Sequence, residues 1–553
     1  MYNNVPLVVI CGHKFLEVYM LKLTQLSCES SKNPLGIATQ KPRFGWKIDT
    51  QLPNAMQEKY HIQVTKEDTC LWDSGEVDSC QSVYVDYQGP QLEYATRYKW
   101  RVRACVNGQW SDWSDNAWFE TALEKWQAPF ISADDIPAES GAKTFGRKID
   151  IAKPIISARV YATAQGIYEL HINGKPASDT CFDPGWTAYD FRLLYRTYDV
   201  TDMLNSGTNT IKAHVAPGWY KGDMGFKDAR GLYGDKMAFS AQVDLCYQDG
   251  THETILTGDD WLFADSTIIY SEIYHGETYD ARKEKDNKIA SQTLQNWQNA
   301  TVCPKGSFAV EPFDGDLVRR IEVIKPISFF VTPKGEKVLD FGQNLTGRVR
   351  LKVSGKQGEK VTLRHAEVLD AHGNFYTENL RSAKCTDTYI LKGDPVETYE
   401  PYFTFHGFRY VAIDEHPGEI RTNDFEAVVI HSDMAKTGEF SCSHPLVNQL
   451  QSNIVWGLRG NFLDIPTDCP QRDERLGWTG DAQIFAATAS YIYDVLPFFR
   501  KWLRDLALDQ LPEGGVPHVI PDVLNRHEKT KGSHSACGWA DAAVIVPWVI
   551  YEH

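Results

Sequence analysis

Apolar and polar residues alternate over much of the chain before about residue 430, as they do in β-strands with one buried face. The clearest case is Arg97–Ala104, where Tyr, Trp, Val and Ala alternate with Arg and Lys. This pattern predicts a half-buried strand with a cationic outer face. Asn107-Gly108 follows, and this dipeptide suits the positive φ values of a tight hairpin turn.

The same pattern returns further along the chain. Tyr168–Ile172 alternates and is closed by Asn173-Gly174, and three later runs at Val361–His365, Tyr389–Leu391 and Arg409–Ile413 have the composition of strands. Turn-forming clusters separate these runs. Together they predict stacked antiparallel β-sandwiches.

The hydrophobic period changes near residue 436. Apolar residues recur every four positions from Leu446 to Leu458, behind Ser443 as a candidate cap and Pro445 in the first turn. Ala482–Tyr493 and Pro497–Leu508 also have the composition of helices. The last part of the chain is therefore predicted to be helical.

A chain of 553 residues is too long for one hydrophobic core. The predicted protein is multidomain, with β-sandwich modules first and helices last. The expected segments are an N-terminal extension at 1–19, a fibronectin-III-like β-sandwich at 20–125, a second β module at 126–312, a third sandwich at 313–435 and a helical domain at 436–553.

Trp110–Ser114 spells WSDWS, a signature also found in the fibronectin-type domains of cytokine receptors. There the tryptophans stack on arginines of a neighbouring strand, and Arg97–Ala104 could supply those arginines. We expect the same packing in a fibronectin-like sandwich. A receptor would require secretion and disulfides, which the rest of the sequence does not favour.

The net charge of −16, without clustered Lys and Arg, argues against nucleic acid or an anionic membrane surface as partner. The twelve cysteines show no CxxC pair and no zinc-ligand spacing, which predicts reduced thiols and no metal site. Val5–Cys11 lacks the basic leading region of a secretory signal. A cytoplasmic protein is expected, and the sequence leaves its oligomeric state, a homodimer included, open.

The segment Asp464–Asp481 concentrates acidic residues, two arginines and a tryptophan. Its prolines and glycines prevent a continuous helix, so a loop is predicted. One interpretation is a pocket for a polyol, in which carboxylates bind hydroxyl groups and a ring packs against carbon. The other is a rigid loop whose acids simply pair with Arg472 and Arg475.

Glycoside hydrolysis requires an acid that protonates the leaving oxygen and a second carboxylate that activates water or attacks directly. On chemistry alone, any acid of this loop could be the proton donor. Burial and a neighbouring carboxylate would raise the pKa of such a group.

The loop resembles the catalytic-loop motif of glycoside hydrolase family 78, the α-L-rhamnosidases. Segments in the same order along the chain also resemble the family: Asn33–Ile37, Pro42–Trp46, Asp183–Thr187, Gly218–Gly222, Asp340–Asn344 and Phe403–Tyr410. The resemblance implies a rhamnosidase N-terminal module at 126–312, a concanavalin-like sandwich at 313–435 and the first helices of an (α/α)6 barrel from 436 onward.

The resemblance also implies an activity, namely inverting hydrolysis of terminal non-reducing α-L-rhamnose from rhamnosylated small molecules or oligosaccharides, without cofactor or metal. Glu474 matches the family's general acid. Asp468 and Asp481 match carboxylates that bind the rhamnose hydroxyls, and Trp478 matches an aromatic residue of the sugar pocket, which we expect near the C6 methyl group.

The roles of two further residues stay open, with two interpretations for each. Arg472 either keeps one of the acids ionised or forms a purely structural ion pair. Trp539 either lines the sugar pocket or belongs to the core.

The sequence departs from the family pattern at both ends. The family's water-activating glutamate lies beyond the position that corresponds to His553, so we expect no general base within these residues. A catalytically inactive carbohydrate-binding fragment is the alternative to an active enzyme. At the other end, Met20–Leu23 resembles the usual start of family members, which leaves residues 1–19 as an extension.

Overall fold

The structure is a computed structural model that describes residues 8–9, 16–17, 20–133, 141–226, 229–285 and 297–553. It divides into two compact units, Met1–Trp126 and Gln127–His553. The predicted extension at 1–19 lies almost entirely outside the described residues. Only the paired strands β1 (Val8–Val9) and β2 (Leu16–Glu17) are described there.

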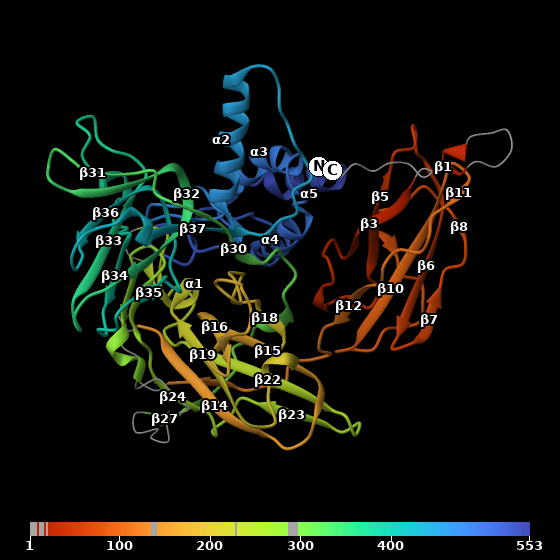
Figure 1. Ribbon diagram of the computed structural model, residues 1–553, viewed down its shortest axis with the longest axis horizontal. Helices are drawn as coiled ribbons and strands as arrows, with labels where there is room; N and C mark the ends of the chain where they lie inside the picture. Colours follow the sequence, from red (N-terminus) through yellow and green to blue (C-terminus); the bar gives the residue numbers. More distant parts are fainter. Residues whose placement is uncertain (1–7, 10–15, 18–19, 134–140, 227–228, 286–296) are drawn as a thin grey trace. The chain divides into compact units, whose positions relative to one another are not determined.

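The first unit is a β-sandwich, as predicted (Figure 1). One sheet has the order β4-β12-β10-β6-β7, with β11 beside β10 and β8 beside β6, and the other has the order β3-β5-β9. The strands are β3 (Leu21–Cys28), β4 (Leu35–Ile37), β5 (Arg43–Thr50), β6 (Gln57–Lys66), β7 (Thr69–Asp73), β8 (Val77–Asp78), β9 (Val85–Asp86), β10 (Arg97–Val106), β11 (Gln109–Trp110) and β12 (Ala117–Thr121).

The alternation in Arg97–Ala104 produces the half-buried strand that was predicted, which is part of β10. Tyr98, Trp100 and Val102 are buried on the inner face of β10. Asn107 and Gly108 follow with φ of 49° and 79°, so the predicted hairpin turn is confirmed.

The arginines of β10 stack on tryptophans, which confirms the packing expected from the WSDWS string. The guanidinium carbon of Arg101 lies 4.6 Å from the ring centre of Trp113, and that of Arg103 lies 4.7 Å from Trp110. A guanidinium over an indole face is attracted by the ring quadrupole. The motif therefore serves the stability of this sandwich.

The second unit begins with two packed sheets, ordered β28-β13-β22-β15-β18-β29, with β23 beside β22, and β17-β16-β19-β14-β24-β27. Their strands are β13 (Phe130–Ser132), β14 (Lys143–Ile151), β15 (Ile155–Gln165), β16 (Ile167–Ile172), β17 (Lys175–Pro176), β18 (Arg192–Asp199), β19 (Gly207–Ala216), β22 (Ala238–Tyr247), β23 (His252–Leu256), β24 (Leu262–Asp265), β27 (Gln298–Asn299), β28 (Thr301–Cys303) and β29 (Ala309–Pro312). The predicted strand Tyr168–Ile172 is β16, closed by Asn173 and Gly174 at positive φ.

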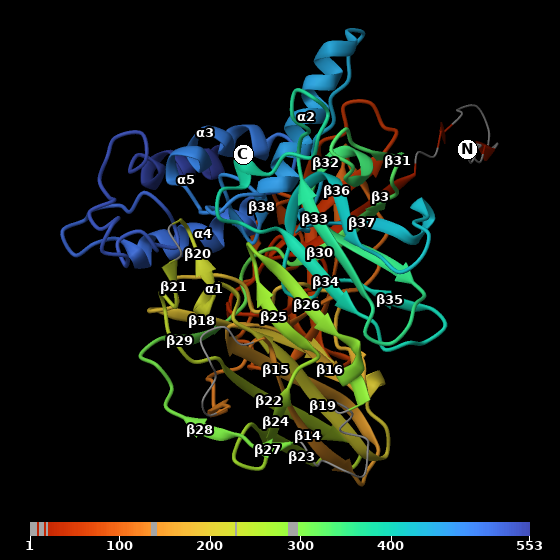
Figure 2. The same ribbon diagram turned by 90° about the vertical axis from the view of Figure 1, so that its left-hand side faces the viewer.

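A ten-stranded sheet follows, in the order β25-β26-β34-β33-β36-β32-β37-β30, with β31 and β35 beside β32 (Figure 2). Its strands are β25 (Ile268–Glu272), β26 (Gly276–Asp280), β30 (Val318–Ile324), β31 (Ser328–Val331), β32 (Lys337–Val353), β33 (Lys360–Ala366), β34 (Thr386–Ile390), β35 (Glu397–Tyr399), β36 (His406–Glu415) and β37 (Phe425–Ser432). The three runs predicted as strands lie in β33, β34 and β36, except that Leu391 falls one residue beyond the end of β34. Strands β25 and β26 also belong to this sheet, although the predicted boundary at 312 assigned their residues to the preceding module.

The second unit also contains short elements: β20 (Asp223–Met224), β21 (Ala229–Arg230), β38 (Phe462–Leu463), β39 (Ile465–Pro466) and the helix α1 (Gly218–Lys221), with 3₁₀ turns at Thr201–Met203, Ala281–Lys285, Glu378–Leu380 and Thr422–Asp424.

The C-terminal part is helical, as predicted, with α2 (Pro445–Asn461), α3 (Thr479–Ser490), α4 (Leu496–Asp509) and α5 (Ala542–Glu552). The predicted cap of α2 is wrong: His444 precedes the helix, and no side chain caps it. The period-four stripe of α2 is only partly buried, because Leu458 is 0% exposed whereas Leu446 is 75% exposed. Helix α3 begins three residues before the predicted start.

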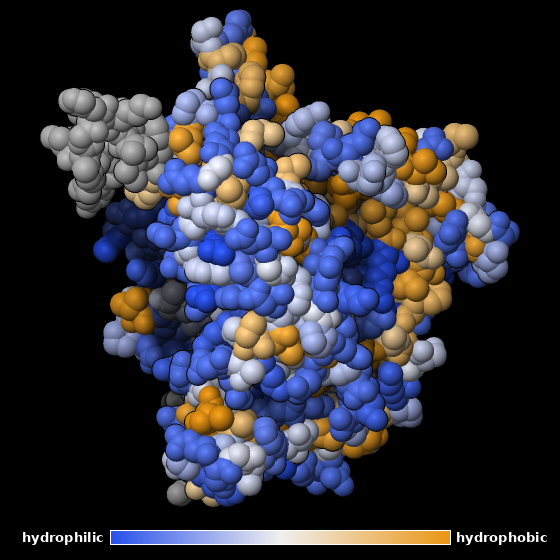
Figure 3. All heavy atoms as spheres, turned by 90° about the vertical axis from the view of Figure 1, so that its right-hand side faces the viewer, coloured by the Kyte–Doolittle hydropathy of each residue, from blue (hydrophilic) through white to orange (hydrophobic). Residues whose placement is uncertain are grey.

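Figure 3 shows one face of the molecule, on which hydrophilic residues predominate and hydrophobic residues gather in separate patches. Among the described residues, none of the helices has both the length and the apolar character needed to cross a bilayer.

Candidate active site

The acid-rich segment begins at Asp464, which links β38 to β39. Its φ of 66° turns the backbone sharply, and its carboxylate is buried. Lys501 of α4 lies 3.1 Å from Oδ2 of this carboxylate and donates to the carbonyl of Trp186 at 2.7 Å. The Trp186 amide donates to the same carboxylate. The start of the segment is thus anchored to α4 and to the preceding β module.

The loop predicted over Asp464–Asp481 extends from Thr467 to Trp478, since Ile465–Pro466 form β39 and Thr479 begins α3. Arg472 bridges two of its acids. Its Nη2 lies 3.1 Å from Asp468 Oδ2, and its Nε lies 2.9 Å from Glu474 Oε2. Trp478 donates from Nε1 to Glu474 Oε1 at 3.1 Å. The structure therefore brings Asp468, Arg472, Glu474 and Trp478 together in one hydrogen-bonded chain.

Arg475 serves a different purpose from Arg472. It is 1% exposed, donates to the carbonyls of Phe405 and Ile273, and lies over the rings of Phe405 and Tyr274. This arginine binds the loop to the neighbouring β structure. The expectation that the acids pair with both arginines therefore holds for Arg472, while Arg475 bonds to carbonyl oxygens.

The acids of the loop differ in pKa. Burial raises the pKa of Asp468 to about 6, with the negative charge of Glu474 acting in the same direction. Burial also raises the pKa of Asp481. For Glu474 burial acts upward too, but hydrogen bonds from Arg472 and Arg381 outweigh it, and the net pKa is lowered. Without a ligand, Glu474 is therefore ionised and Asp468 is the more readily protonated acid.

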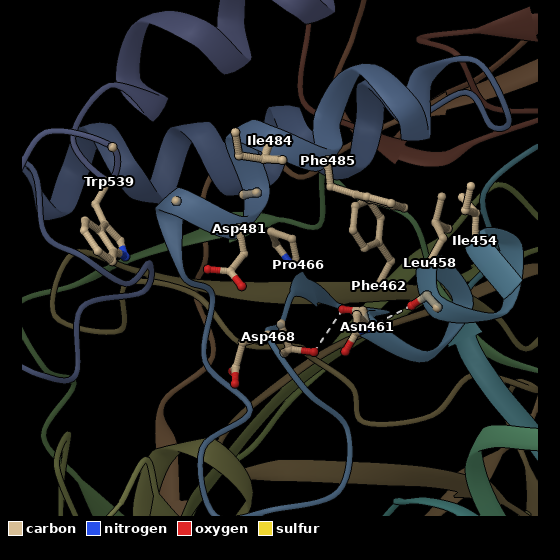
Figure 4. A pocket seen from close by; sticks show the side chains of 15 residues that line it. Ile454, Leu458, Asn461, Phe462, Pro466, Asp468, Asp481, Ile484, Phe485 and Trp539 are labelled. Atoms are coloured by element: carbon tan, nitrogen blue, oxygen red, sulfur yellow. Dashed lines mark hydrogen bonds between the residues drawn. The ribbon is translucent and has the colours of Figure 1, made fainter. Parts of the chain in front are cut away.

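A cavity of about 640 Å³ opens beside the loop (Figure 4). Asp468, Asp481 from the first turn of α3, and Trp539 line it, together with apolar side chains of α2 and α3 such as Phe485. Trp539 is 39% exposed, which places it at the cavity and outside the core. Carboxylates and an aromatic ring around one cavity form a suitable environment for a polyhydroxylated ligand.

Sequence reasoning missed the second arginine of the site. Arg381 follows the 3₁₀ turn Glu378–Leu380 with φ of 57°, and its Nη2 lies 2.7 Å from Glu474 Oε2. Its Nε forms an ion pair with Asp473 at 2.6 Å. No pattern around Arg381 marks it, because the residues that it meets lie more than ninety positions further along the chain.

Two groups of described residues have the donor types of a metal site. One is the buried set His365, Asp387 and His406 on strands β33, β34 and β36 of the ten-stranded sheet, in which His406 Nε2 lies 3.1 Å from Asp387 Oδ2. The other contains Asp468 and Glu474, between which the Arg472 guanidinium already supplies positive charge. The predicted absence of a metal or cofactor stays a prediction.

Four family models match the chain in order: the Rha78A-like N-terminal immunoglobulin domain at 23–125, the alpha-L-rhamnosidase N-terminal domain at 153–322, the bacterial alpha-L-rhamnosidase concanavalin-like domain at 331–431 and the bacterial alpha-L-rhamnosidase 6 hairpin glycosidase domain at 435–553. The class defined by fold and site is that of multidomain glycoside hydrolases with a helical six-hairpin domain.

An alpha-L-rhamnosidase of Streptomyces avermitilis is 33% identical, over 96% of this chain and 68% of its own length. The crystal structure of an α-L-rhamnosidase from Aspergillus terreus superposes with a TM-score of 0.91 at 38% identity, over 96% of this chain and 62% of that one. The structure of the Streptomyces avermitilis α-L-rhamnosidase complexed with L-rhamnose has a TM-score of 0.87 at 32% identity, over 96% and 68%. The chain belongs to the bacterial α-L-rhamnosidase family, glycoside hydrolase family 78.

The chain spans between 59% and 68% of the length of the curated relatives that it matches. The family assignment made from the catalytic-loop motif is confirmed. So is the architecture of β modules followed by helices of a six-hairpin domain. The roles of individual site residues stay predictions.

Proposed function

We propose that this chain provides the rhamnose-binding and proton-donating part of an α-L-rhamnosidase active site. The reaction is the inverting hydrolysis of terminal non-reducing α-L-rhamnosyl groups from glycosides. The main support is the hydrogen-bonded chain Asp468–Arg472–Glu474–Trp478, of which Asp468 lines a cavity of about 640 Å³ together with Asp481, whereas Glu474 and Trp478 do not line it.

Asp468 and Asp481 would accept hydrogen bonds from the sugar hydroxyls, since a carboxylate is a strong acceptor with room for two hydroxyl groups. Trp539 offers a ring surface for the carbon face of the sugar. Trp478, which the family resemblance places near the C6 methyl group of rhamnose, packs partly against the hydrophobic core and does not line the cavity.

Glu474 would act as the general acid, although its two arginine bonds lower its pKa in the absence of ligand. A sugar bound against Asp468, which Arg472 links to Glu474, would exclude water from this side of the loop and strengthen the burial effect that already acts upward on the Glu474 carboxyl. Arg381 can move away from Glu474 because its side chain is 43% exposed. Both changes would favour the protonated form of Glu474 when substrate is bound.

Inversion requires a second carboxylate about 6.5–9.5 Å from the acid, with a water molecule between them. By resemblance to the family, this base lies outside residues 1–553. We therefore expect the 553-residue chain to bind L-rhamnose and to turn over rhamnosides slowly or not at all. A version that extends past His553 would be active.

The test is the hydrolysis of p-nitrophenyl α-L-rhamnoside by both lengths, with proton NMR to identify the first anomer released. We expect turnover only from the longer version, with β-L-rhamnose appearing first. Appearance of the α-anomer first would contradict inversion, and rapid turnover by the 553-residue chain would contradict the absence of the base. Rhamnose binding without turnover at either length would leave a carbohydrate-binding protein.

A further inference from the structure

Arg381 is held in a backbone conformation that arginine rarely adopts. Its φ of 57° and ψ of −116° lie outside the regions that are open to residues with a Cβ atom. Such a conformation persists only where surrounding contacts fix it, and it is typical of functional sites. The side chain of Arg381 meets two neighbouring acids of the loop Thr467–Trp478, namely Asp473 and Glu474.

The Arg381 guanidinium contacts these two carboxylates in different ways. Its Nη2 donates to Glu474 Oε2 at 2.7 Å and to the backbone carbonyl of Asp473 at 3.0 Å. Its Nε lies 2.6 Å from Asp473 Oδ1, but this oxygen accepts no hydrogen bond from any described residue. The aligned hydrogen bond to a carboxylate therefore goes to Glu474, while Asp473 contributes its charge at short range.

The Asp473 carboxylate is fixed beside this guanidinium. Asp473 is only 7% exposed, and Ser382 Oγ donates to its Oδ2 at 2.7 Å. Its Oδ1 is a buried acceptor without a donor, which is an unfavourable state for a carboxylate oxygen. A rotation of the Arg381 guanidinium would supply that donor, because Nε is already 2.6 Å away and the arginine side chain is 43% exposed.

Glu474 and Asp473 compete for the same guanidinium. Arg472 and Trp478 also donate to Glu474, at 2.9 and 3.1 Å, so Glu474 keeps two donors when Arg381 leaves it. A neutral carboxyl group binds a guanidinium more weakly than a carboxylate does. Protonation of Glu474 therefore shifts the balance between the two acids towards Asp473.

We infer that Asp473 is a positioning residue for the general acid and takes over the Arg381 guanidinium when Glu474 becomes protonated. The inference rests on the proposed function, in which Glu474 takes up a proton from water and passes it to the leaving oxygen. Asp473 does not line the large cavity, so it acts through Arg381 and Glu474. In the observed position the hydrogen bond from Arg381 lowers the pKa of Glu474, and the exchange removes this bond.

Other ionisable groups also face Glu474, so the change in its pKa on ligand binding is more informative than the pKa itself. Arg472 favours the ionised form of Glu474, whereas negative charge on a neighbouring acid favours the neutral form. These neighbours are Asp468 and Cys469 of the loop and Asp481 at the start of α3.

The first test is a pair of crystal structures, of the unsubstituted 553-residue chain and of Glu474→Gln. Glutamine keeps the shape of the protonated acid and removes its charge. We expect Arg381 to bond to Glu474 in the unsubstituted chain and to Asp473 Oδ1 in the variant. An Arg381 side chain that stays on residue 474 in Glu474→Gln overturns the inference.

The second test is the pKa of Glu474, measured by carbon-13 NMR of labelled glutamate with and without L-rhamnose. The Glu474 signal is identified by its absence in Glu474→Gln. The variants are Asp473→Asn and Asp473→Glu, and circular dichroism confirms that each is folded. The matched control is Asp414→Asn, which also removes the carboxylate of an ion pair with an arginine, since Arg364 Nε lies 2.6 Å from Asp414 Oδ2.

In the unsubstituted chain we expect L-rhamnose to raise the pKa of Glu474 by about 1–3 pH units, the size of the effect of one neighbouring arginine. Asp473→Asn should lose most of this rise, because Arg381 then has no second carboxylate to bind. Asp473→Glu should retain much of it, and the control should retain all of it. A purely structural role for Asp473 would leave the rise equal in all folded variants, and that result overturns the inference.

The two tests separate the inference from the proposed function. Rhamnose binding without a rise in the pKa of Glu474, or with a rise that does not depend on Asp473, overturns the inference and leaves rhamnose binding standing. Absence of rhamnose binding contradicts the proposed function, and the structure of Glu474→Gln then decides whether Arg381 exchanges between the two acids.

Discussion

Lys501 is expected to be the side chain whose removal most damages the catalytic segment. It is 1% exposed and lies 3.1 Å from Asp464 Oδ2, whose side chain is 2% exposed. It also donates to the carbonyl of Trp186 at 2.7 Å and to that of Asp464 at 3.2 Å. Lys501→Met keeps the length of the side chain and removes all three interactions.

The size of the effect follows from burial. Removing one partner of a buried ion pair leaves an uncompensated charge and costs about 3–5 kcal/mol. The Asp464 carboxylate keeps its bond from the Trp186 amide, so we expect the lower half of this range. The matched control is Lys436→Met. Its partner is Glu439, both side chains are more than half exposed, and solvent screening leaves this pair little effect on stability, so a far smaller loss is expected.

The assay is urea denaturation of the full chain, followed by tryptophan fluorescence, with the transition of the Gln127–His553 unit compared between variants. A loss of less than about 1 kcal/mol in Lys501→Met would refute the reasoning. So would a double variant with Asp464→Asn whose loss equals the sum of the single losses, because a coupled pair must be non-additive. Asp464 precedes Asp468 by four residues, so Lys501→Met should also weaken L-rhamnose binding.

Three other predictions concern the site and the first unit. Arg381→Ala removes a hydrogen bond that lowers the pKa of Glu474, so carbon-13 NMR of labelled Glu474 should show a higher pKa, and an unchanged titration would contradict the role of Arg381. The pKa of Asp468 is about 6 in the folded state, above its ordinary value of 3.8, so the folded state keeps this proton to higher pH than the unfolded chain. The contribution of Asp468 to the free energy of unfolding should therefore fall by about 2–3 kcal/mol as pH rises from 3.8 to about 6. Asp468→Asn should flatten that slope, and a slope equal to that of wild type would exclude Asp468 as its source. Trp113→Ala removes the ring under Arg101 and Arg103 and should destabilise the Met1–Trp126 unit by at least about 1 kcal/mol, with no change in rhamnose affinity; equal stability would show that the stacking contributes nothing.

Patterns among neighbouring residues were enough to predict individual strands, loops and helices. The alternation around Trp100 predicts β10, and the prolines and glycines after Asp464 predict the loop before α3. The period-four stripe predicts helix α2, but it does not reveal what the helix faces, and Leu446 is exposed although it belongs to that stripe.

The parts of the site that sequence reasoning missed are held by distant contacts. Arg381 reaches Glu474 across ninety-three positions, and Lys501 reaches Asp464 across thirty-seven. The pKa of Glu474 is lowered by hydrogen bonds from Arg472 and Arg381 together, whereas burial and neighbouring acids alone suggest a raised pKa. The lowered pKa of Glu474 can therefore be recognised only when the three-dimensional positions of Arg381 and Glu474 are known.

The most direct test of the account is the initial rate of L-rhamnose release from methyl α-L-rhamnopyranoside, whose alkoxide leaving group must be protonated, by Glu474→Gln in the version that extends past His553. Glutamine keeps the shape of the side chain and cannot donate a carboxyl proton. The account predicts a rate about 10²–10⁴-fold below that of the unsubstituted version, the range that general acid catalysis contributes. A rate equal to that of the unsubstituted version would contradict the assignment of Glu474 as the general acid.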